Sequence, residues 1–406
     1  MSIKLRLIVM NFFQFAVWGA WLISLGSYVG GGLGFNGTQI GSFFATMGLA
    51  SLVMPALMGI VADRWMPAQK LLGICHLSAA LFMFLAASHR DYFLLYIYLL
   101  LSVCFYMPTL ALSNSVAYNA LDKEGLDTVK HFPPIRVWGT IGFIVAMIAS
   151  DWLGFSQNNL QLYFSAILSI ALGVYTFSLP ECPISNQLKN ASWVDKLGLR
   201  AFSLFKQKKM AIFFLFSMFL GMSLQVTNAF GNFYLTDFFG ANPLYKDTFG
   251  VQHATTLISL SQMSETLCIL LIPFFLGRFG IKKVMLISML AWFFRFALLG
   301  LGNPGDGVWL LILSMVVYGV AFDFFNISGS LFVDQQTDPS IRSSAQGVFM
   351  IMTNGLGAFI GSYAAGQIVD WIGWPNSWFV FAGYSLVVTL LFSVFFKYDY
   401  RKEKKH

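Results

Sequence analysis

Long apolar stretches separated by short polar gaps dominate this chain. About 20 helical residues cross a bilayer core roughly 30 Å thick, and apolar stretches of that length begin near residues 6, 37, 70, 92, 134, 160, 210, 250, 282, 307, 343 and 376. Only 11% of the residues are charged, against roughly 25% in a typical soluble domain, so a water-soluble globule would lack polar surface. We therefore predict an all-α polytopic membrane protein with twelve transmembrane helices.

The distribution of basic residues predicts how these helices are oriented. Of the 25 lysines and arginines, only Arg90 and Lys246 fall in loops on one side, and Arg136 and Arg295 lie within spans. All the others fall on the opposite side, together with both termini. The positive-inside rule then places both termini in the cytoplasm of a multi-pass protein of the cell (inner) membrane. The basic charge reflects topology, so no nucleic-acid partner is expected.

The longest polar gap, Glu181–Lys209, divides the chain into two sets of six spans. We predict an N-terminal six-helix half at 1–180, a cytoplasmic linker at 181–209, and a C-terminal six-helix half with a basic cytoplasmic tail at 210–406. Within the linker, Ser192 and Asp195 have the spacing of a capping box. Apolar residues then recur at helical spacing and predict an amphipathic helix on the membrane surface: Val194, Leu197, Ala201, Phe202 and Phe205.

The two halves resemble each other weakly. Tyr106 and Asn114 in the fourth span correspond to Tyr318 and Asn326 in the tenth, both with an offset of 212 residues. Repeated six-helix units are typical of major facilitator transporters, in which the substrate lies near the bilayer midplane between the halves. We therefore expect the major facilitator fold, with twelve transmembrane helices in two six-helix halves.

The segment GIVADRWMPAQK (59–70) resembles the loop that follows the second helix in that superfamily. It keeps Gly59, Asp63 and Arg64, but Met66 replaces the second glycine of the superfamily pattern. We predict that the three retained residues form a gating motif.

Two acidic residues lie near the middle of apolar spans. Asp323 is in the span near 308–333, and Glu265 is in the span near 254–276. A carboxylate at this depth costs several kcal/mol, so an intramembrane acid is by default a functional site. Interhelical hydrogen bonding explains isolated amides in spans, but it does not require ionisable groups. The two acids therefore indicate proton-coupled transport.

Other polar and aromatic residues share single helical faces with these acids. Because polar groups facing lipid are costly, such faces should turn inward. The candidate sets are Arg136, Thr140 and Phe143 in the fifth span, Gln225 and Asn228 in the seventh, Gln262 and Glu265 in the eighth, and Tyr318, Phe322 and Asn326 in the tenth, with Asp323 beside them.

Three further residues have a plainer interpretation. Arg136 lies near the cytoplasmic end of its span and could extend to the membrane surface instead. Arg295, alone among Phe and Leu, is interpreted as structural, reaching an acid in a neighbouring helix. His76 lies near a span end and is expected to satisfy local hydrogen bonds.

The chemistry of these faces suits a neutral polar ligand with a flat part. Amides can pair with a nucleobase edge or with sugar hydroxyls, and the rings of Phe143, Tyr318 and Phe322 can stack on a base. A single nearby arginine argues against a phosphorylated substrate. Residue chemistry alone leaves sugar and nucleoside both open.

An enzyme and a non-transporting nucleoside sensor are the alternatives from other classes. The sequence shows no nucleophile–base pair, phosphate loop or metal-binding cysteine pattern among its four cysteines, and it has no soluble output domain. We expect no enzymatic activity, no cofactor and no metal.

Four segments resemble the bacterial nucleoside:proton symporter family of the major facilitator superfamily, and within it the nucleoside permease G type. They are FPPIRVWGTIGF (132–143), QVTNAFGN (225–232), SQMSET (261–266) and VYGVAFDFFNISGS (317–330). The likeness extends over nearly the whole chain.

This resemblance implies import of purine and pyrimidine nucleosides driven by the proton gradient. It also implies substrate contacts on helices five, seven, eight and ten, with Asp323 as the proton-coupling acid. The implied substrate contacts are Arg136, Thr140, Phe143, Gln225, Asn228, Gln262, Glu265, Tyr318 and Phe322. The expected partners are a nucleoside, protons and membrane lipid, and the expected state is a monomer. The nearest alternative is a sugar or oligosaccharide:proton symporter of the same fold.

Overall fold

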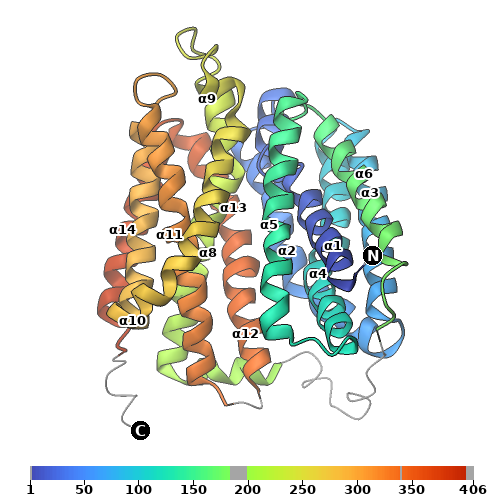
Figure 1. Cartoon of the computed structure of the whole chain (residues 1–406). Coiled ribbons are helices and arrows are strands. Elements are labelled where there is room, and N and C mark those ends of the chain that lie inside the picture. The colour runs from blue at the N-terminus through green and yellow to red at the C-terminus, as the bar shows by residue number, and fades with distance from the viewer. Residues whose placement is uncertain (1, 183–198, 339–340, 399–406) are drawn as a thin grey trace. The chain divides into compact units, whose positions relative to one another are not determined.

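The computed structural model describes residues 2–182, 199–338 and 341–398, and these residues are almost entirely helical, with no strand among them (Figure 1). The described residues group into two compact units. The first contains residues 2–35 and 46–182. The second contains residues 36–45 together with the described residues from 199 onward.

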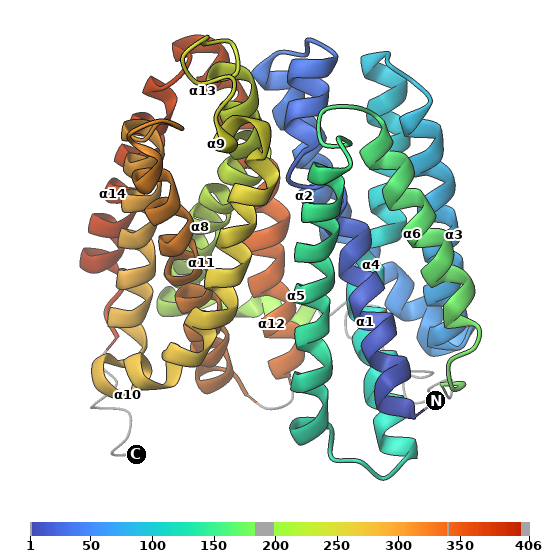
Figure 2. The same ribbon diagram turned by 45° about the horizontal axis from the view of Figure 1, so that its top comes forward.

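The first unit is built from six helices and one π-helical segment, except that the first turns of the second helix, up to residue 45, belong to the second unit. In chain order these are α1 (Ile3–Gly19), η1 (Ser27–Gly32), α2 (Gly37–Arg64), α3 (Ala68–Ala87), α4 (Tyr92–Lys123), α5 (Thr128–Trp152) and α6 (Leu160–Thr176). α1 packs along α5, and α3 packs on both α4 and α6, an arrangement visible in both ribbon views (Figures 1 and 2).

The second unit begins with a short 3-10 helix and continues with long helices. In chain order its elements are η2 (Leu199–Lys206), α8 (Lys208–Phe233), η3 (Tyr234–Phe238), α9 (Phe249–Gln252), α10 (Ala254–Leu301), α11 (Val308–Gln336), α12 (Arg342–Met350), η5 (Ile351–Gly357), α13 (Ala358–Ile372) and α14 (Asn376–Phe395). α10 packs most extensively on α11 and also on α14.

Gly280 divides α10 into two arms. Its φ of 74° lies in the left-handed region, which a glycine adopts without the steric penalty of a Cβ. The first arm precedes Gly280 and the second arm follows it. Figures 1 and 2 show the turn at the base of α10, where the chain reverses direction. α10 therefore provides two spans rather than one.

Nine helices of the described chain are long and apolar enough to cross a membrane, with α10 counted once. The second arm of α10, the shorter apolar helix α6 and the 17-residue α1 bring the described segments to twelve. These segments match the predicted spans, and they confirm the prediction of an all-α polytopic membrane protein.

The first turn of α2 is capped twice. Asn36 and Gln39 form a reciprocal capping box, in which each backbone N–H donates to the other side chain, at 3.1 and 2.8 Å. The Asp370 carboxylate of α13 also accepts from the backbone N–H groups of Gly37 and Thr38, at 2.5 and 2.7 Å. These contacts explain why residues 36–45 group with the second unit.

Only part of the expected linker helix falls within the described residues. Ser192, Val194, Asp195 and Leu197 lie outside them. Residues 199–206 form η2, in which Ala201 and Leu204 are buried and Phe202 is exposed. η2 packs on α8 and α12, so this segment does have one buried and one exposed face.

Candidate functional site

Three candidate residues of the first unit lie on α5. The guanidinium carbon of Arg136 is 3.9 Å from the ring centroid of Phe15 on α1. A guanidinium over an aromatic face gains electrostatic energy from the ring quadrupole. Arg136 is half-buried, so the structure places it against α1 rather than extended into water. Phe15 is a partner that sequence reasoning did not identify.

Thr140 and Phe143 continue the same face of α5. Thr140 is half-buried, whereas Phe143 is only 8% exposed. The Phe143 ring meets Trp18 of α1 edge to face, with centroids 6.4 Å apart. Phe143 is therefore held by packing against α1, and little of its ring is accessible in this conformation.

Gln225 and Asn228 contact each other on α8. The Asn228 amide nitrogen donates to the Gln225 side-chain oxygen at 3.5 Å, as residues three apart on a helix can. Gln225 is buried and Asn228 is half-buried. The structure therefore brings these two amides together as their spacing predicted.

Tyr318 and Phe322 form a parallel pair on α11, which we call the aromatic pair. Their ring centroids lie 5.7 Å apart and their planes differ by only 3°. Tyr318 is 4% exposed, whereas Phe322 is half-buried. The two rings are therefore stacked one helical turn apart, and Phe322 is the more exposed of them.

Gln262 and Glu265, both half-buried, lie on the first arm of α10. The Gln262 side chain lies beside Tyr318, and Glu265 interacts electrostatically with the same residue. A Cβ at Gly319 would lie 2.6 Å from the Ser264 carbonyl oxygen. The missing side chain at Gly319 therefore lets α11 approach α10 closely enough for these contacts.

Asp323 is buried in the second unit. It is 4% exposed, and one of its two carboxylate oxygens, Oδ2, has no hydrogen-bond partner among the described residues. Glu265 is the charged group that acts most strongly on it. A buried carboxyl group without full hydrogen bonding is costly to keep ionised, so Asp323 is suited to bind and release a proton.

The interpretation of Arg295 as the partner of an acid is wrong. Arg295 is 3% exposed on the second arm of α10, and no carboxylate among the described residues forms an ion pair with it. Its Nη1 donates instead to the Ser314 carbonyl oxygen at 2.9 Å. Its guanidinium carbon lies 4.5 Å from the ring centroid of Tyr318.

His76 does satisfy its hydrogen bonds, as expected, but its partners lie on other helices rather than close to it in the sequence. His76 is fully buried on α3, and its ring bonds two other helices. Nε2 lies 2.9 Å from the Gln14 side-chain oxygen on α1, and Nδ1 lies 3.0 Å from the Ser169 hydroxyl on α6. Because the Gln14 amide nitrogen donates to Thr109 at 2.7 Å, its oxygen faces His76 and Nε2 carries a hydrogen.

The predicted gating residues lie at the end of α2. Gly59 is half-buried, and a Cβ there would meet no atom within 4 Å. The backbone of Asp63 and Arg64 completes α2, and their side chains lie outside what the structure describes. The role of these three residues therefore stays a prediction.

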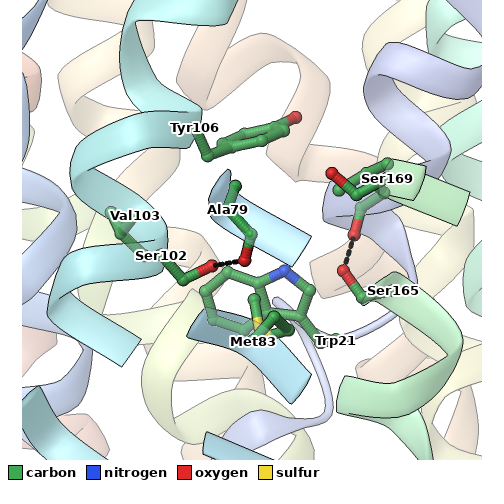
Figure 3. Close-up of a pocket in the computed structure, with 9 residues that line it drawn as sticks. Trp21, Ala79, Met83, Ser102, Val103, Tyr106, Ser165 and Ser169 are labelled. Atoms are coloured by element: carbon green, nitrogen blue, oxygen red, sulfur yellow. Dashed lines mark hydrogen bonds between the residues drawn. The ribbon is translucent and has the colours of Figure 1, made fainter. Parts of the chain in front are cut away.

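A small cavity lies inside the first unit (Figure 3). Residues of α1, α3, α4 and α6 line it, among them Met83, Tyr106 and Ser169, together with Trp21 just after α1. The Ser102 hydroxyl beside it donates to the Ala79 carbonyl oxygen at 2.8 Å. Its volume of about 10 Å³ has room for about one water, so it is too small for a sugar or a nucleoside.

No group of three metal-ligating side chains occurs among residues 2–182, 199–338 and 341–398. The candidate residues are amides, hydroxyls, aromatic rings, one guanidinium and two acids. This set can bind a neutral polar molecule and exchange a proton.

Comparison with known proteins gives matches over nearly the full chain. The family model described as nucleoside H+ symporter matches residues 1–401. The nucleoside permease NupG of Escherichia coli (strain K12) is 48% identical, covering 98% of this chain and 97% of the relative. The xanthosine permease of the same organism is 50% identical, covering 100% and 99%.

Solved structures agree with the sequence matches. The crystal structure of nucleoside transporter NupG superposes with a TM-score of 0.92 at 48% identity, covering 98% of this chain and all of the other. A peptide transporter of the POT family, at 13% identity, shares the fold with a TM-score of 0.76 over 96% of this chain and 93% of the other.

These findings confirm the predicted fold and family. The protein has the major facilitator fold, and its relatives are named permeases and transporters rather than enzymes. Nearly full-length matches leave no large part of the chain unaccounted for. The chain belongs to the nucleoside H+ symporter family.

Proposed function

We propose that this protein is a nucleoside:proton symporter of the cell (inner) membrane. It imports purine and pyrimidine nucleosides by alternating access, driven by the proton gradient. Two relatives that match almost the whole chain are named a nucleoside permease and a xanthosine permease, which supports nucleosides as the substrate class.

One observation in the structure carries the proposal. On α11, the buried Asp323 directly follows Phe322, the half-buried member of the aromatic pair. The half-buried ring of this pair can stack on a base, with about 1–3 kcal/mol for each stacked base. A buried acid beside it can couple proton binding to the same site. A sugar would make less use of the two parallel rings.

The proposal assigns roles to individual residues. Asp323 carries the proton, and Gly59, Asp63 and Arg64 form the gating motif. The substrate contacts are Arg136, Thr140, Phe143, Gln225, Asn228, Gln262, Glu265, Tyr318 and Phe322. The parallel aromatic pair, the paired amides on α8 and the contact between Gln262 and Tyr318 support this assignment.

The proposal also covers topology and assembly. The distribution of lysines and arginines supports cytoplasmic termini, and the repeat supports two six-helix halves, 1–180 and 210–406, joined by residues 181–209. We propose that the protein works as a monomer within membrane lipid.

Counterflow in proteoliposomes tests the proposed substrate. Purified protein is reconstituted in separate vesicles, each loaded with one unlabelled nucleoside or sugar, and uptake of the same compound in labelled form is compared. Labelled uridine and a purine nucleoside should exchange, whereas labelled sucrose and maltose should not. Exchange of sugars without nucleosides would assign the protein to sugar:proton symport.

An imposed proton gradient then tests coupling. Vesicles loaded at higher pH than the medium should concentrate uridine above the external level. A protonophore should abolish this accumulation and leave counterflow intact. Accumulation that persists with the protonophore present contradicts proton coupling.

A further inference from the structure

A buried cation lies behind the aromatic pair, in a place that the proposed function does not explain. Arg295 is 3% exposed on the second arm of α10. Burying a charge in a membrane-spanning segment is expensive, and such residues usually pair with an opposite charge. Since no carboxylate of the described residues forms an ion pair with Arg295, other contacts must compensate it.

Those contacts converge on Tyr318 and on the helix that carries it. The Arg295 guanidinium lies over the Tyr318 ring at 4.5 Å. Its Nη1 donates to the Ser314 carbonyl oxygen at 2.9 Å and contacts the Ser261 hydroxyl at 3.4 Å. Ser314 lies one turn before Tyr318 on α11, and its hydroxyl donates back to the Arg295 carbonyl oxygen at 3.1 Å.

A second side chain of the same helical arm also touches the ring. Trp292, three residues before Arg295, meets Tyr318 edge to face with centroids 6.0 Å apart. Arg295 and Trp292 therefore lie on one face of α10 and both contact Tyr318. Tyr318 in turn lies parallel to Phe322.

We infer that Arg295 is a positioning residue, which fixes the Tyr318 ring so that it stays parallel to Phe322 and holds that half-buried ring available to a base. This inference rests on the proposed function, because it assumes that the aromatic pair contacts the substrate. The guanidinium is planar and can lie over the ring while it donates to the Ser314 carbonyl oxygen. A lysine keeps the charge but not this planar contact, and a methionine keeps only the bulk.

A double-mutant cycle tests whether Arg295 acts through Tyr318. Uridine affinity is measured on purified protein for wild type, Arg295→Met, Tyr318→Leu and the double variant. A buried cation–π contact is worth about 2 kcal/mol, so Arg295→Met should weaken uridine binding about tenfold or more in the wild-type background. In the Tyr318→Leu background the same change should alter affinity less than about twofold, since coupled residues are not additive.

A conservative variant and a control variant distinguish a positioning role of Arg295 from a general loss of protein stability. Arg295→Lys should fall between wild type and Arg295→Met, because it retains the charge without the planar contact. Arg90→Met removes an exposed arginine after α3 and should leave affinity unchanged. Melting temperature is measured on every sample. If Arg295→Met does not fold, the cycle is run with Arg295→Lys.

Two results overturn the inference. The first is an equal loss of affinity for Arg295→Met in both backgrounds, which would show that it acts independently of Tyr318. The second is a lower melting temperature with unchanged affinity, which would make Arg295 purely structural. Failure of wild-type protein to bind any nucleoside would instead refute the proposed function, so the two failures are distinguishable.

Discussion

Each of the two units buries a polar cluster, and the clusters differ in how completely their groups are paired. In the first unit, Gln14, His76 and Thr109 form a neutral network in which every side-chain polar atom has a partner among the described residues. In the second unit, Arg295 Nε and Asp323 Oδ2 are buried without one. The first cluster is neutral and satisfied, and the second is ionisable and unsatisfied.

This difference distinguishes buried polar groups that stabilise the fold from buried polar groups that serve a function. A fully satisfied buried network rigidifies a core, whereas a buried charge without full pairing destabilises the fold. The first unit also buries unpaired atoms, such as Trp18 Nε1 and Tyr28 Oη, but these groups are neutral at physiological pH. Unpaired ionisable groups therefore support the proposal that proton coupling takes place in the second unit.

Asp323→Asn should have the largest effect on transport. It tests most directly whether the unpaired acid of the second unit couples transport to protons. An amide cannot exchange a proton, so the variant should lose uphill accumulation of uridine completely while it keeps counterflow. Accumulation is measured in proteoliposomes with an imposed proton gradient. Asp334→Asn on the same helix is the matched control, because Asp334 is half-exposed and pairs with Arg342 at the surface. An Asp323→Asn variant that still concentrates uridine would show that coupling lies elsewhere.

Glu265→Gln should strongly reduce the affinity for uridine but not the affinity for the free base uracil. A hydrogen bond from a ribose hydroxyl to a carboxylate contributes about 1.5–3 kcal/mol, or roughly ten- to a hundredfold in affinity. Uridine binding should weaken by that factor, and binding of the free base uracil should change little. Glu181→Gln, at an exposed ion pair with Lys70, provides the control. An equal loss for both ligands would mean that Glu265 does not contact the sugar.

Phe322→Ala should weaken uridine binding about ten- to a hundredfold, from the loss of about 1–3 kcal/mol of stacking. Phe322→Tyr should retain much of the affinity, because the ring remains. Affinity and melting temperature are measured on the same samples, and Phe294→Ala serves as an exposed phenylalanine control. A drop in melting temperature with unchanged affinity would make Phe322 a packing residue and shift the stacking role to Phe143.

His76→Leu should have the smallest effect on transport and a clear effect on stability. It leaves the Gln14 side-chain oxygen without its partner, while the Ser169 hydroxyl still donates to the backbone carbonyl oxygen of residue 76. An unsatisfied buried group costs about 1–3 kcal/mol. The melting temperature should fall while the uridine KM stays within about twofold of wild type. His89→Leu, at the end of α3 with a single bond to Leu85, is the control. A large change in KM would contradict a purely structural role.

Much of the fold could be predicted from the sequence because a membrane imposes a simple length rule. Each apolar stretch of about 20 residues became a helical segment, and the short gap near Gly280 became a turn. The π-helical segments η1, η3 and η5 were not predicted. Their extra residue per turn depends on tertiary packing, which hydropathy does not encode.

The candidate residues were predictable where one helix carries them, and less so where partners come from other helices. The four-residue spacing of Tyr318 and Phe322 predicted a shared face, and the rings are parallel. The contact of Phe15 with Arg136 joins residues 121 positions apart, and periodicity within one helix cannot reveal it. Arg295 was misinterpreted because charge complementarity suggested an acid, whereas an aromatic ring can also face a cation.

The network around His76 also constrains how the protein is made. Its bonds connect α1, α3, α4 and α6 across separations of 62 to 95 residues. During synthesis, α1 and α3 enter the membrane before the chain that supplies Thr109 and Ser169 exists. The hydrogen bonds of Gln14 and His76 therefore remain incomplete until α6 is inserted. Assembly of this unit can be completed only after its last helix arrives, so a chain truncated before α6 should remain a target for quality-control proteolysis.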